Sequence, residues 1–282
     1  MKDLTPRLLR AWPIPAPPSD AHHGRVLVVG GSDEMPGTVI LAATAALRAG
    51  AGKVQIATTR GIAHVVGVAV PEARVFGLRE TRTGSIAVSA GDDIAARANE
   101  ADAVLIGPGM LDPAGVSSLL RRVLVQIEGP PIVLDAAALP HLLRHHDALA
   151  SFQGRAVLTP HPGEIARMLP DPPEIPSEAA RMAAERFGAV TLLKGPETFV
   201  AAPDGTLLRH KNGQPGLATS GSGDVLAGLL AGLLARGMEA LHATAWAVHL
   251  HAEAGARLAE SAAPLGFLAR ELLGEIPRLL PR

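Results

Sequence analysis

Cysteine is absent from the 282-residue sequence, which excludes disulfide bonds, thiolate metal sites and cysteine nucleophiles. Runs of Lys or Arg are absent too, and the 26 basic and 27 acidic side chains nearly cancel. We therefore expect neither nucleic acid nor an anionic membrane as a partner, because both need a basic surface. The longest apolar-rich stretch, residues 225–234, is about ten residues long, whereas a membrane-spanning helix needs ~20. A small molecule is the expected partner.

The N-terminal segment lacks the continuous apolar stretch of a signal peptide. Residues 1–20 are rich in proline, with Lys2, Arg7 and Arg10 scattered among apolar residues. The cytoplasm is therefore the expected location. Apolar residues make up 48% of the chain, and no internal repeat or low-complexity linker interrupts it. We predict a single domain over residues 1–282, built around one large core.

Short apolar segments alternate with glycine-rich or polar loops, which is typical of an α/β protein. Residues 25–29 (RVLVV) predict a buried parallel strand that ends in Gly30-Gly31, and an Ala-rich helix is expected at 37–50. Further strands are predicted at 53–58, 103–106, 132–134, 157–158 and 190–193. In open α/β sheets the ligand lies at the carboxyl ends of the strands, so we expect the loops there to form the functional site.

The C-terminal half of the sequence predicts a hairpin and then helices. Residues 198–202 and 206–210 flank the turn-forming Pro203-Asp204-Gly205, which predicts a β-hairpin that interrupts the parallel order. Helices are expected at 224–236, 238–260 and 267–280. The expected architecture is therefore a mostly parallel central sheet flanked by helices.

The most informative segment is 212–232 (NGQPGLATSGSGDVLAGLLAG), where small residues precede a strongly apolar helix. Unpaired N–H groups and the positive end of the helix dipole favour phosphate there, so Gly221, Ser222 and Gly223 are predicted to form an anion hole. Asp224 follows directly, where it could accept a proton from a hydroxyl that attacks the bound phosphate. An Asp in a first helical turn is also a favoured cap, and Gly-Ser-Gly-Asp alone leaves cap and base equally open.

Longer motifs decide more. GPG at 107–109 is weak, whereas TPHPGE at 159–164, followed by LKGxxT and then GSGDVLAG, is specific. With these motifs in this order, the sequence resembles the nucleotide-dependent NAD(P)H-hydrate dehydratase family of the ribokinase-like superfamily. The resemblance covers almost the whole chain, through VLVVGGSDEMPGTVILAATAALRAGAG (26–52), AVLIGPG (103–109), VLDA (133–136), LTPHPGEIARML (158–169), LLKGPET (192–198) and GLATSGSGDVLAGLLAGLLARG (216–237).

This resemblance implies a ribokinase-like three-layer α/β sandwich and a repair reaction on damaged metabolites. A nucleotide would phosphorylate the hydroxyl of the S epimer of hydrated NADH or NADPH, and phosphate would then leave to restore NADH or NADPH. ADP is the expected donor, with AMP as the other product, and Mg²⁺ would assist the transfer. ATP, which would give ADP, stays open, because the predicted anion hole binds a terminal phosphate of either nucleotide. A homotetramer is also implied. Many relatives carry an epimerase domain on the same chain, and here a separate epimerase protein would supply that activity.

The family also implies roles for individual positions. Asp224 matches the catalytic aspartate. The substrate would be contacted by Thr38, Gly109, His161 and Asp224, with Thr38 standing where relatives usually place alanine. The adenine nucleotide would be bound by Lys194, Gly195, Pro196, Glu197 and Thr198, with Gly223 at its phosphate end.

Residue chemistry supports some of these roles and leaves others open. Lys194 ends a predicted buried strand, and because an unpaired buried ammonium is costly it should pair with phosphate or carboxylate unless it is exposed. His161 lies between two prolines, where a hydrogen-bonding role and a solvated loop position are both consistent with the sequence. Glu164 could approach Mg²⁺ through water, or it could only serve the dipole of the helix it opens.

Three histidines fall on the long helix expected at 238–260. His249 and His251 lie two positions apart, whereas helical zinc ligands lie four apart on one face. With His242, we therefore expect them to be surface or interface histidines rather than zinc ligands.

Three departures from the family pattern fall near the expected substrate pocket. Ala137 replaces the second aspartate that usually follows the middle strand, Met110-Leu111 stands where another glycine is common, and His22-His23-Gly24 lacks the usual lysine. Two other functions therefore stay open. One is a kinase of a vitamin precursor of the hydroxyethylthiazole or hydroxymethylpyrimidine type, and the other is a nucleotide-binding protein that has lost its activity.

Overall fold

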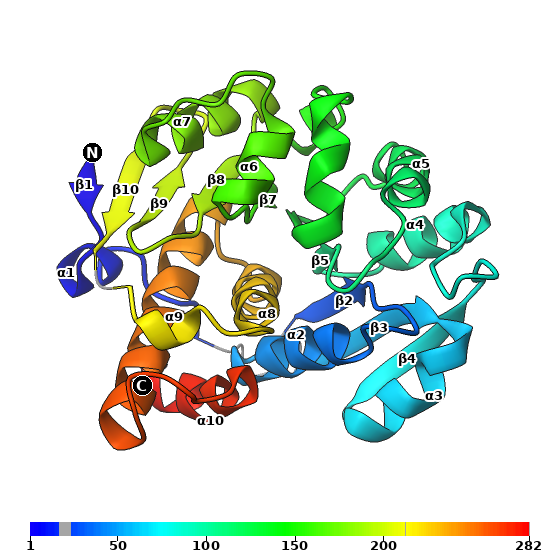
Figure 1. Cartoon of the computed structure of the whole chain (residues 1–282), viewed down its shortest axis with the longest axis horizontal. Helices are drawn as coiled ribbons and strands as arrows, with labels where there is room; N and C mark the ends of the chain where they lie inside the picture. The colour runs from blue at the N-terminus through cyan, green and yellow to red at the C-terminus, as the bar shows by residue number, and fades with distance from the viewer. Residues whose placement is uncertain (17–23, 212, 282) are drawn as a thin grey trace.

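The computed structural model describes residues 1–16, 24–211 and 213–281. Its described strands form one ten-stranded sheet in the order β1-β10-β9-β8-β7-β6-β5-β2-β3-β4 (Figure 1). Strand β9 pairs antiparallel with both β8 and β10, and every other pair in the sheet is parallel. The mostly parallel α/β sheet that the sequence predicts is therefore confirmed. Of the departing segment His22-His23-Gly24, the two histidines lie outside the described residues.

The strands agree closely with the sequence predictions, and the predicted hairpin is formed by β9 and β10. Two edge strands were not predicted: β1 has only two residues, and the short apolar pattern of β4 is interrupted by Arg74 and Gly77, with most of the strand not buried. The strands are β1 (Lys2–Asp3), β2 (Arg25–Val29), β3 (Lys53–Thr59), β4 (Ala73–Leu78), β5 (Ala103–Ile106), β6 (Ile132–Leu134), β7 (Ala156–Leu158), β8 (Val190–Leu193), β9 (Thr198–Ala201) and β10 (Leu207–His210).

The predicted helices correspond to α2, α8, α9 and α10, with ends displaced by a few residues at most. The α-helices are α1 (Pro6–Leu9), α2 (Gly37–Arg48), α3 (Arg60–Ala69), α4 (Gly91–Asn99), α5 (Pro113–Leu124), α6 (Pro162–Met168), α7 (Pro176–Phe187), α8 (Ser222–Ala235), α9 (Ala240–Ser261) and α10 (Ala269–Leu279). Short 3₁₀ helices are η1 (Val88–Ala90), η2 (Ala136–Leu143), η3 (Ala150–Phe152) and η4 (Pro215–Leu217).

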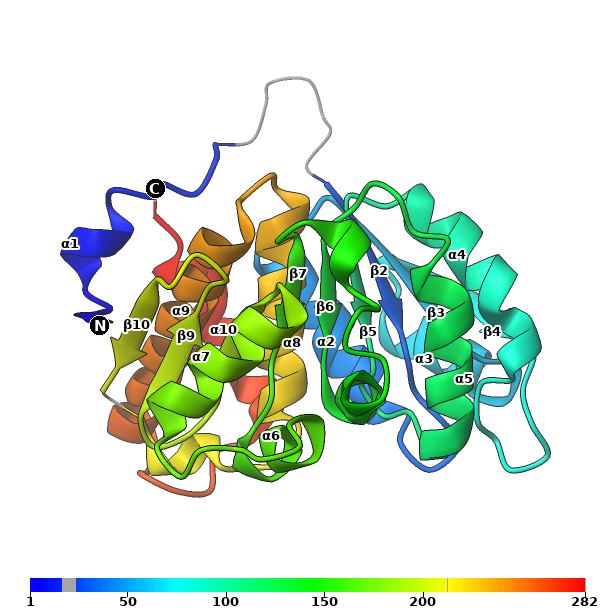
Figure 2. The same ribbon diagram turned by 90° about the horizontal axis from the view of Figure 1, so that it is seen from above.

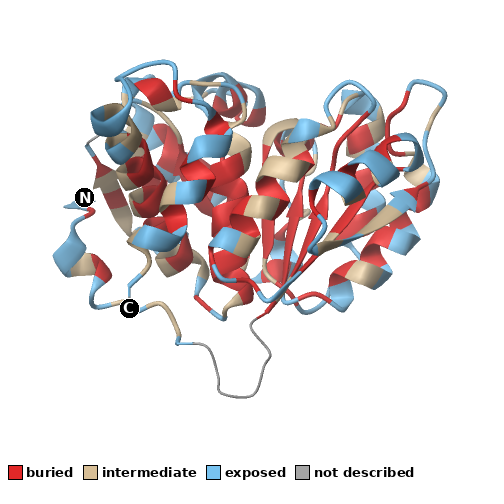
Figure 3. Cartoon of the chain, turned by 90° about the horizontal axis from the view of Figure 1, so that it is seen from below, coloured by how far each residue is buried: buried red, intermediate tan, exposed pale blue. Residues whose placement is uncertain are grey.

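The sheet separates two apolar cores. Because alternate side chains of a strand point to opposite faces, Val26 and Val28 of β2 enter one core while Leu27 and Val29 enter the other. Helices α2, α3, α8, α9 and α10 cover the first face, and α4, α5, α6 and α7 cover the second (Figure 1). Figure 3 shows the buried residues concentrated in the strands and on the inner sides of these helices. The result is three layers.

Helix α8 lies deep in the first layer, and its backbone approaches α2 closely. A Cβ at Gly228 would collide with the carbonyl group of Ala42, so only glycine allows this separation. Almost every residue of α8 is buried, which explains why its sequence is apolar all round rather than on one stripe. This packing fixes the N-terminal end of α8 at the carboxyl edge of the sheet.

The order of the strands creates a switch point between β2 and β5. From β2 the chain proceeds outward to β3 and β4, and it then returns to β5 and proceeds the other way through β6, β7 and β8. At this point the two glycine loops meet, because the N–H of Gly31 donates to the carbonyl of Pro108 at 2.8 Å. Ligands of open α/β sheets bind at such crevices.

The N-terminal arm lies at the β1–β10 edge of the sheet, the edge opposite to β4 (Figure 2). Asp3 of β1 accepts hydrogen bonds from Arg209 at 3.0 Å and from Lys211 at 2.7 Å, both from the β10 side. Further along the arm, the indole N–H of Trp246 on α9 donates to the carbonyl of Trp12 at 2.6 Å.

Within the described part of the chain, no helix is both long and apolar enough to cross a membrane.

Candidate active site

A cavity of about 610 Å³ opens where α8 and α9 meet the loops after β7 and β8. This volume is typical of small-molecule sites. Its wall combines apolar side chains with polar groups from separate elements, namely His161, Lys194, His210, Ser222 and His251. The other lining residues are Pro162, Gly195, Pro196, Thr198, Gly213, Gln214, Pro215, Leu217, Ala218, Gly223, Leu226, Val248 and Ala252.

The first turn of α8 borders this cavity. Gly221 is the N-cap residue, in a left-handed conformation with φ +88°, and no side chain caps the helix. The N–H of Ser222 donates to the carbonyl of Thr219 at 3.3 Å. Within the described residues, the N–H groups of Gly223 and Asp224 have no acceptor, so they are the donors left for an anion at the positive end of the helix dipole.

Asp224 lies in this turn but does not cap it, since its carboxylate makes no hydrogen bond or ion pair within the described residues. Its pKa is raised from 3.8 to about 7, mainly by burial and also by the negative charge of Asp135, while the positive charge of Lys194 only partly opposes both. A carboxyl group with a pKa near neutrality is poised to exchange a proton at physiological pH. The geometry thus favours the role of a base over that of a cap.

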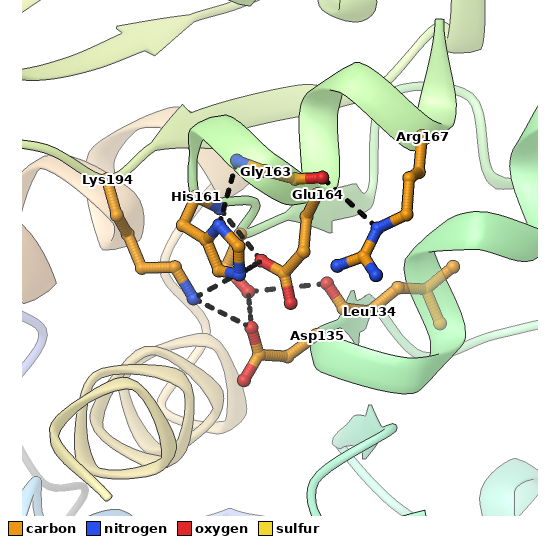
Figure 4. A network of polar contacts seen from close by, with 8 residues as sticks. Leu134, Asp135, His161, Gly163, Glu164, Arg167 and Lys194 are labelled. Atoms are coloured by element: carbon orange, nitrogen blue, oxygen red, sulfur yellow. Dashed lines mark hydrogen bonds and ion pairs between the residues drawn. The ribbon is translucent and has the colours of Figure 1, made fainter. Parts of the chain in front are cut away.

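A lysine and two carboxylates gather beside this turn (Figure 4). Lys194 Nζ lies 3.1 Å from Asp135 Oδ1 and 4.0 Å from Glu164 Oε2. Burial alone lowers the pKa of Lys194, but the carboxylates of Asp135 and Glu164 outweigh it and the net shift is upward. The predicted carboxylate partner of Lys194 is therefore present, and the ammonium stays charged. Its Nζ lies close to Gly223, since a Cβ added at this glycine would be 3.4 Å from it.

Thr159 and Asp135 complete this cluster, and neither was assigned a site role from the sequence. The hydroxyl of Thr159 donates to Asp135 Oδ1 at 2.7 Å, and Asp135 is buried. The sequence signal was the position of Asp135 directly after β6 and of Thr159 directly after β7. Both positions lie at the carboxyl edge of the sheet, where β6 and β7 are neighbours.

His161 and Glu164 form the N-terminal cap of α6. His161 Nδ1 accepts from the N–H of Gly163 at 3.0 Å, while Glu164 Oε2 accepts from the N–H of His161 at 2.8 Å (Figure 4). This reciprocal pair is a capping box, which fixes the entry of the TPHPGE loop. The ring of His161 is about half exposed and lines the cavity, and its Nε2 lies 3.6 Å from Glu164 Oε2.

Only part of the nucleotide loop expected at 194–198 lines the cavity. Lys194, Gly195, Pro196 and Thr198 line the cavity. Glu197 lies outside its described lining, with its carboxylate exposed and 3.9 Å from Arg209. This part of the loop therefore contacts the β10 edge rather than the cavity.

Thr38 and Gly109 lie against each other at the switch point, outside the described lining of the cavity. Gly109 has φ +64°, and the Thr38 hydroxyl donates to the carbonyl of Met35 at 2.9 Å. Next to Gly109, Met110 is buried and Leu111 is half buried, while Ala137 is half buried in η2. The departures from the family pattern at 110–111 thus adjoin Gly109 of the predicted substrate pocket, whereas Ala137 follows Asp135, the partner of Lys194, by two residues.

Gly109→Ala is expected to destabilise the protein by about 1–3 kcal/mol, since the new Cβ would strain a left-handed backbone and collide with the Thr38 hydroxyl. It would also lie 2.8 Å from the carbonyl oxygen of Met35. Urea unfolding measures the change. Gly129→Ala is the matched control, because a Cβ at Gly129 meets nothing within 4 Å. Equal stability of the two variants would contradict this steric account.

The prediction of a surface or interface position is wrong for His251. Its side chain is buried on the inner face of α9, and Nε2 lies 3.0 Å from Ser222 Oγ. His251 shares this face with Ala247 and Ala254, which lie four positions before it and three after it. That spacing was visible in the sequence, whereas the contact with α8 was not.

The sequence matches the family model described as NAD(P)H-hydrate dehydratase over residues 26–278. It is 45% identical to the ADP-dependent (S)-NAD(P)H-hydrate dehydratase of Xanthomonas campestris pv. campestris, over 100% of this chain and 97% of that protein. It is also 41% identical to a bifunctional NAD(P)H-hydrate repair enzyme of Moorella thermoacetica, over 92% of this chain and 49% of that one.

Solved structures show the same fold. A ribokinase-like superfamily protein from Enterococcus faecalis superposes with a TM-score of 0.85 at 26% identity, covering 99% of this chain and 95% of that one. The ADP/ATP-dependent NAD(P)H-hydrate dehydratase of Bacillus subtilis, co-crystallised with ATP/Mg²⁺ and soaked with CoA, gives a TM-score of 0.77 at 29% identity, covering 98% and 97%. The predicted ribokinase-like fold is confirmed, and the chain belongs to the NAD(P)H-hydrate dehydratase family.

Proposed function

We propose that this protein dehydrates the S epimer of hydrated NADH and NADPH, using ADP as the phosphoryl donor and releasing AMP and phosphate. One observation carries the proposal: a carboxyl group with a pKa of about 7, Asp224, lies in the same helical turn as free N–H donors and next to a charged lysine. These are the parts that phosphoryl transfer to a hydroxyl requires. Membership of the family points to the hydroxyl of the hydrated nicotinamide ring.

In the first step Asp224 accepts the proton of that hydroxyl. The hydroxyl oxygen of the substrate attacks the terminal phosphorus of ADP at the same time. The bond from this phosphorus to the bridging oxygen breaks, and AMP leaves. The N–H groups of Gly223 and Asp224 and the ammonium of Lys194 compensate the charge on the phosphoryl oxygens. In the second step the carbon–oxygen bond breaks, phosphate leaves, and the neighbouring ring carbon loses a proton, which restores the dihydronicotinamide.

We propose the apolar part of the cavity for the adenine nucleotide and the side of Thr38, Gly109 and Asp224 for the hydrated substrate. The cavity wall from Leu217, Leu226 and Val248 is suited to an adenine ring. Asp224 lies outside the described lining, directly after Gly223, which is part of it. The two substrates would then meet from opposite sides at the first turn of α8, where the phosphoryl group is exchanged.

Magnesium fits this site only if the protein and the nucleotide phosphates supply its ligands together. The described residues form no group of three His, Asp or Glu side chains that could hold a metal ion alone. Mg²⁺ usually takes one or two carboxylates together with phosphates and water. Glu164 meets this need, because the cap and Lys194 engage only its Oε2. When bound, the ion would neutralise charge on the phosphate oxygens.

Two associations of the protein are also part of the proposal. Only one epimer of the hydrate is consumed in this reaction, and the bifunctional relative combines repair activities in a chain about twice the length that matches here. We therefore expect a separate epimerase to supply the S form. We also expect a homo-oligomer, with a tetramer as its form, which light scattering after gel filtration would measure.

The test of the proposed function is the recovery of NADH from its hydrate, followed by absorbance of the reduced nicotinamide. We expect recovery with ADP and Mg²⁺, with phosphate released free and in equal amount to AMP. Phosphate found attached to an organic product would instead support a kinase of a vitamin precursor. Nucleotide binding without any turnover would support an inactive binding protein.

The rate of dehydration should rise with pH through about 7 and then reach a plateau, because Asp224 must be ionised to accept the proton. The pH profile of kcat/KM for the hydrate measures this, with thermal melting at each pH as a control for unfolding. A profile that is already flat from pH 5 upward would show that Asp224 titrates like an ordinary carboxyl group, and it would contradict the assignment.

A further inference from the structure

Helix α9 contacts the first turn of α8 through the buried histidine His251. His251 Nε2 lies 3.1 Å from the carbonyl oxygen of Ser222 and 3.0 Å from its hydroxyl. A carbonyl oxygen can only accept, so Nε2 carries the proton and donates it. Burial lowers the pKa of His251 to about 4, with Lys194 also lowering it and the Ser222 carbonyl opposing, so the ring is neutral at pH 7.

The bonded carbonyl belongs to the same peptide unit as the N–H of Gly223. A peptide unit is planar and trans, so the C=O of Ser222 and the N–H of Gly223 point in opposite directions. Holding the oxygen on the α9 side therefore aims the N–H away from α9. A hydrogen bond to the carbonyl also polarises the unit and makes the N–H a stronger donor.

The first turn of α8 has no side-chain cap of its own. The N-cap is Gly221, a residue without a side chain, and no side-chain hydrogen bond caps the helix. Glycines at 221 and 223 make the backbone around Ser222 permissive, and an anion site works best when its donors are held in place before the ligand binds. His251 contacts the peptide unit that lies between these two glycines.

We propose that His251 is a positioning residue, which orients the Ser222–Gly223 peptide so that the N–H of Gly223 points at the phosphoryl group of the nucleotide. The proposal rests on the proposed function, since it needs a nucleotide phosphate at this turn. It assigns to α9 a role in binding phosphate. The sequence does not suggest this role, because His251 lies 29 residues after Ser222.

Calorimetric binding of ADP and of adenosine to the full chain tests this role without measuring turnover. Adenosine lacks phosphate, so it reports on the rest of the cavity. We expect His251→Leu to weaken ADP binding about 10-fold or more and to weaken adenosine binding clearly less, since His251 also lines the cavity. His251→Gln, which retains a donor, should restore much of the loss of ADP affinity. Melting temperatures of both variants control for folding.

Parallel weakening of both ligands in His251→Leu would overturn the proposal, as would a His251→Gln variant that binds ADP no better than His251→Leu. If wild-type protein fails to bind ADP, the proposed function itself fails, which is a distinct result. A second measurement needs no variant: ¹⁵N NMR of the His251 ring should show the proton on Nε2. A ring protonated only on Nδ1 would also overturn the proposal.

Discussion

Asp224→Asn is expected to lower kcat for dehydration by about 10²–10⁴-fold, the usual contribution of a positioned general base. The amide has nearly the same shape as the carboxylate but cannot take the proton of the attacking hydroxyl. Binding of ADP should change little, because the backbone N–H of Gly223 and that of the substituted residue both remain. Stopped-time assays of NADH recovery, with KM determined separately, measure the loss.

The same change should make the protein more stable above pH 7. The raised pKa of Asp224 means that the folded protein keeps a proton that the unfolded chain releases, so stability falls as the pH rises from about 4 to about 7. Asparagine removes this cost, and each kcal/mol gained raises Tm by about 2–4 °C. Asp171→Asn, at an exposed position, is the matched control. Full activity of Asp224→Asn would exclude Asp224 as the base.

Lys194→Met is expected to have the second-largest effect, on both stability and nucleotide binding. It removes the ion-pair partner of Asp135, whose side chain is only 3% exposed, and breaking a buried pair on one side costs about 3–5 kcal/mol. The Lys194 side chain is 22% exposed, so we expect the lower end of this range. ADP affinity should fall about 10- to 100-fold with the loss of a charged donor. Urea unfolding and calorimetry measure the two effects.

Two further variants separate these effects. The double variant Lys194→Met with Asp135→Asn also removes the buried charge of Asp135, so stability should partly recover while ADP affinity does not. The recovery is only partial because the buried carboxylate of Glu164, 4.0 Å from Lys194 Nζ, still loses this ammonium. Lys53→Met, at an exposed position on β3, is the control for a lost surface charge. Wild-type stability of Lys194→Met would show that Asp135 does not depend on this ammonium.

The sequence alone predicted the elements that local pattern specifies. Strands such as β2 and β6 are short β-branched runs, and the hairpin of β9 and β10 follows from the turn residues between them. The Gly-Ser-Gly-Asp turn was also readable, because a helix N-terminus after glycines is an anion site wherever it lies in the fold. The family resemblance then supplied the reaction. Edge strand β4 was missed, since Arg74 and Gly77 interrupt its short apolar pattern and most of its residues are not buried.

What the sequence could not decide is which of these loops touch. Lys194 and Asp135 are 59 residues apart and meet because β6, β7 and β8 are neighbours in the sheet, an order set by packing and not by local pattern. His251 was predicted at a surface or interface, and it is buried because α9 packs against α8. The pKa of Asp224 is likewise a property of burial and of neighbouring charges. The chemical groups were therefore determined by the sequence, whereas their protonation and mutual orientation were decided by the tertiary structure, because both depend on distances between segments remote in the chain.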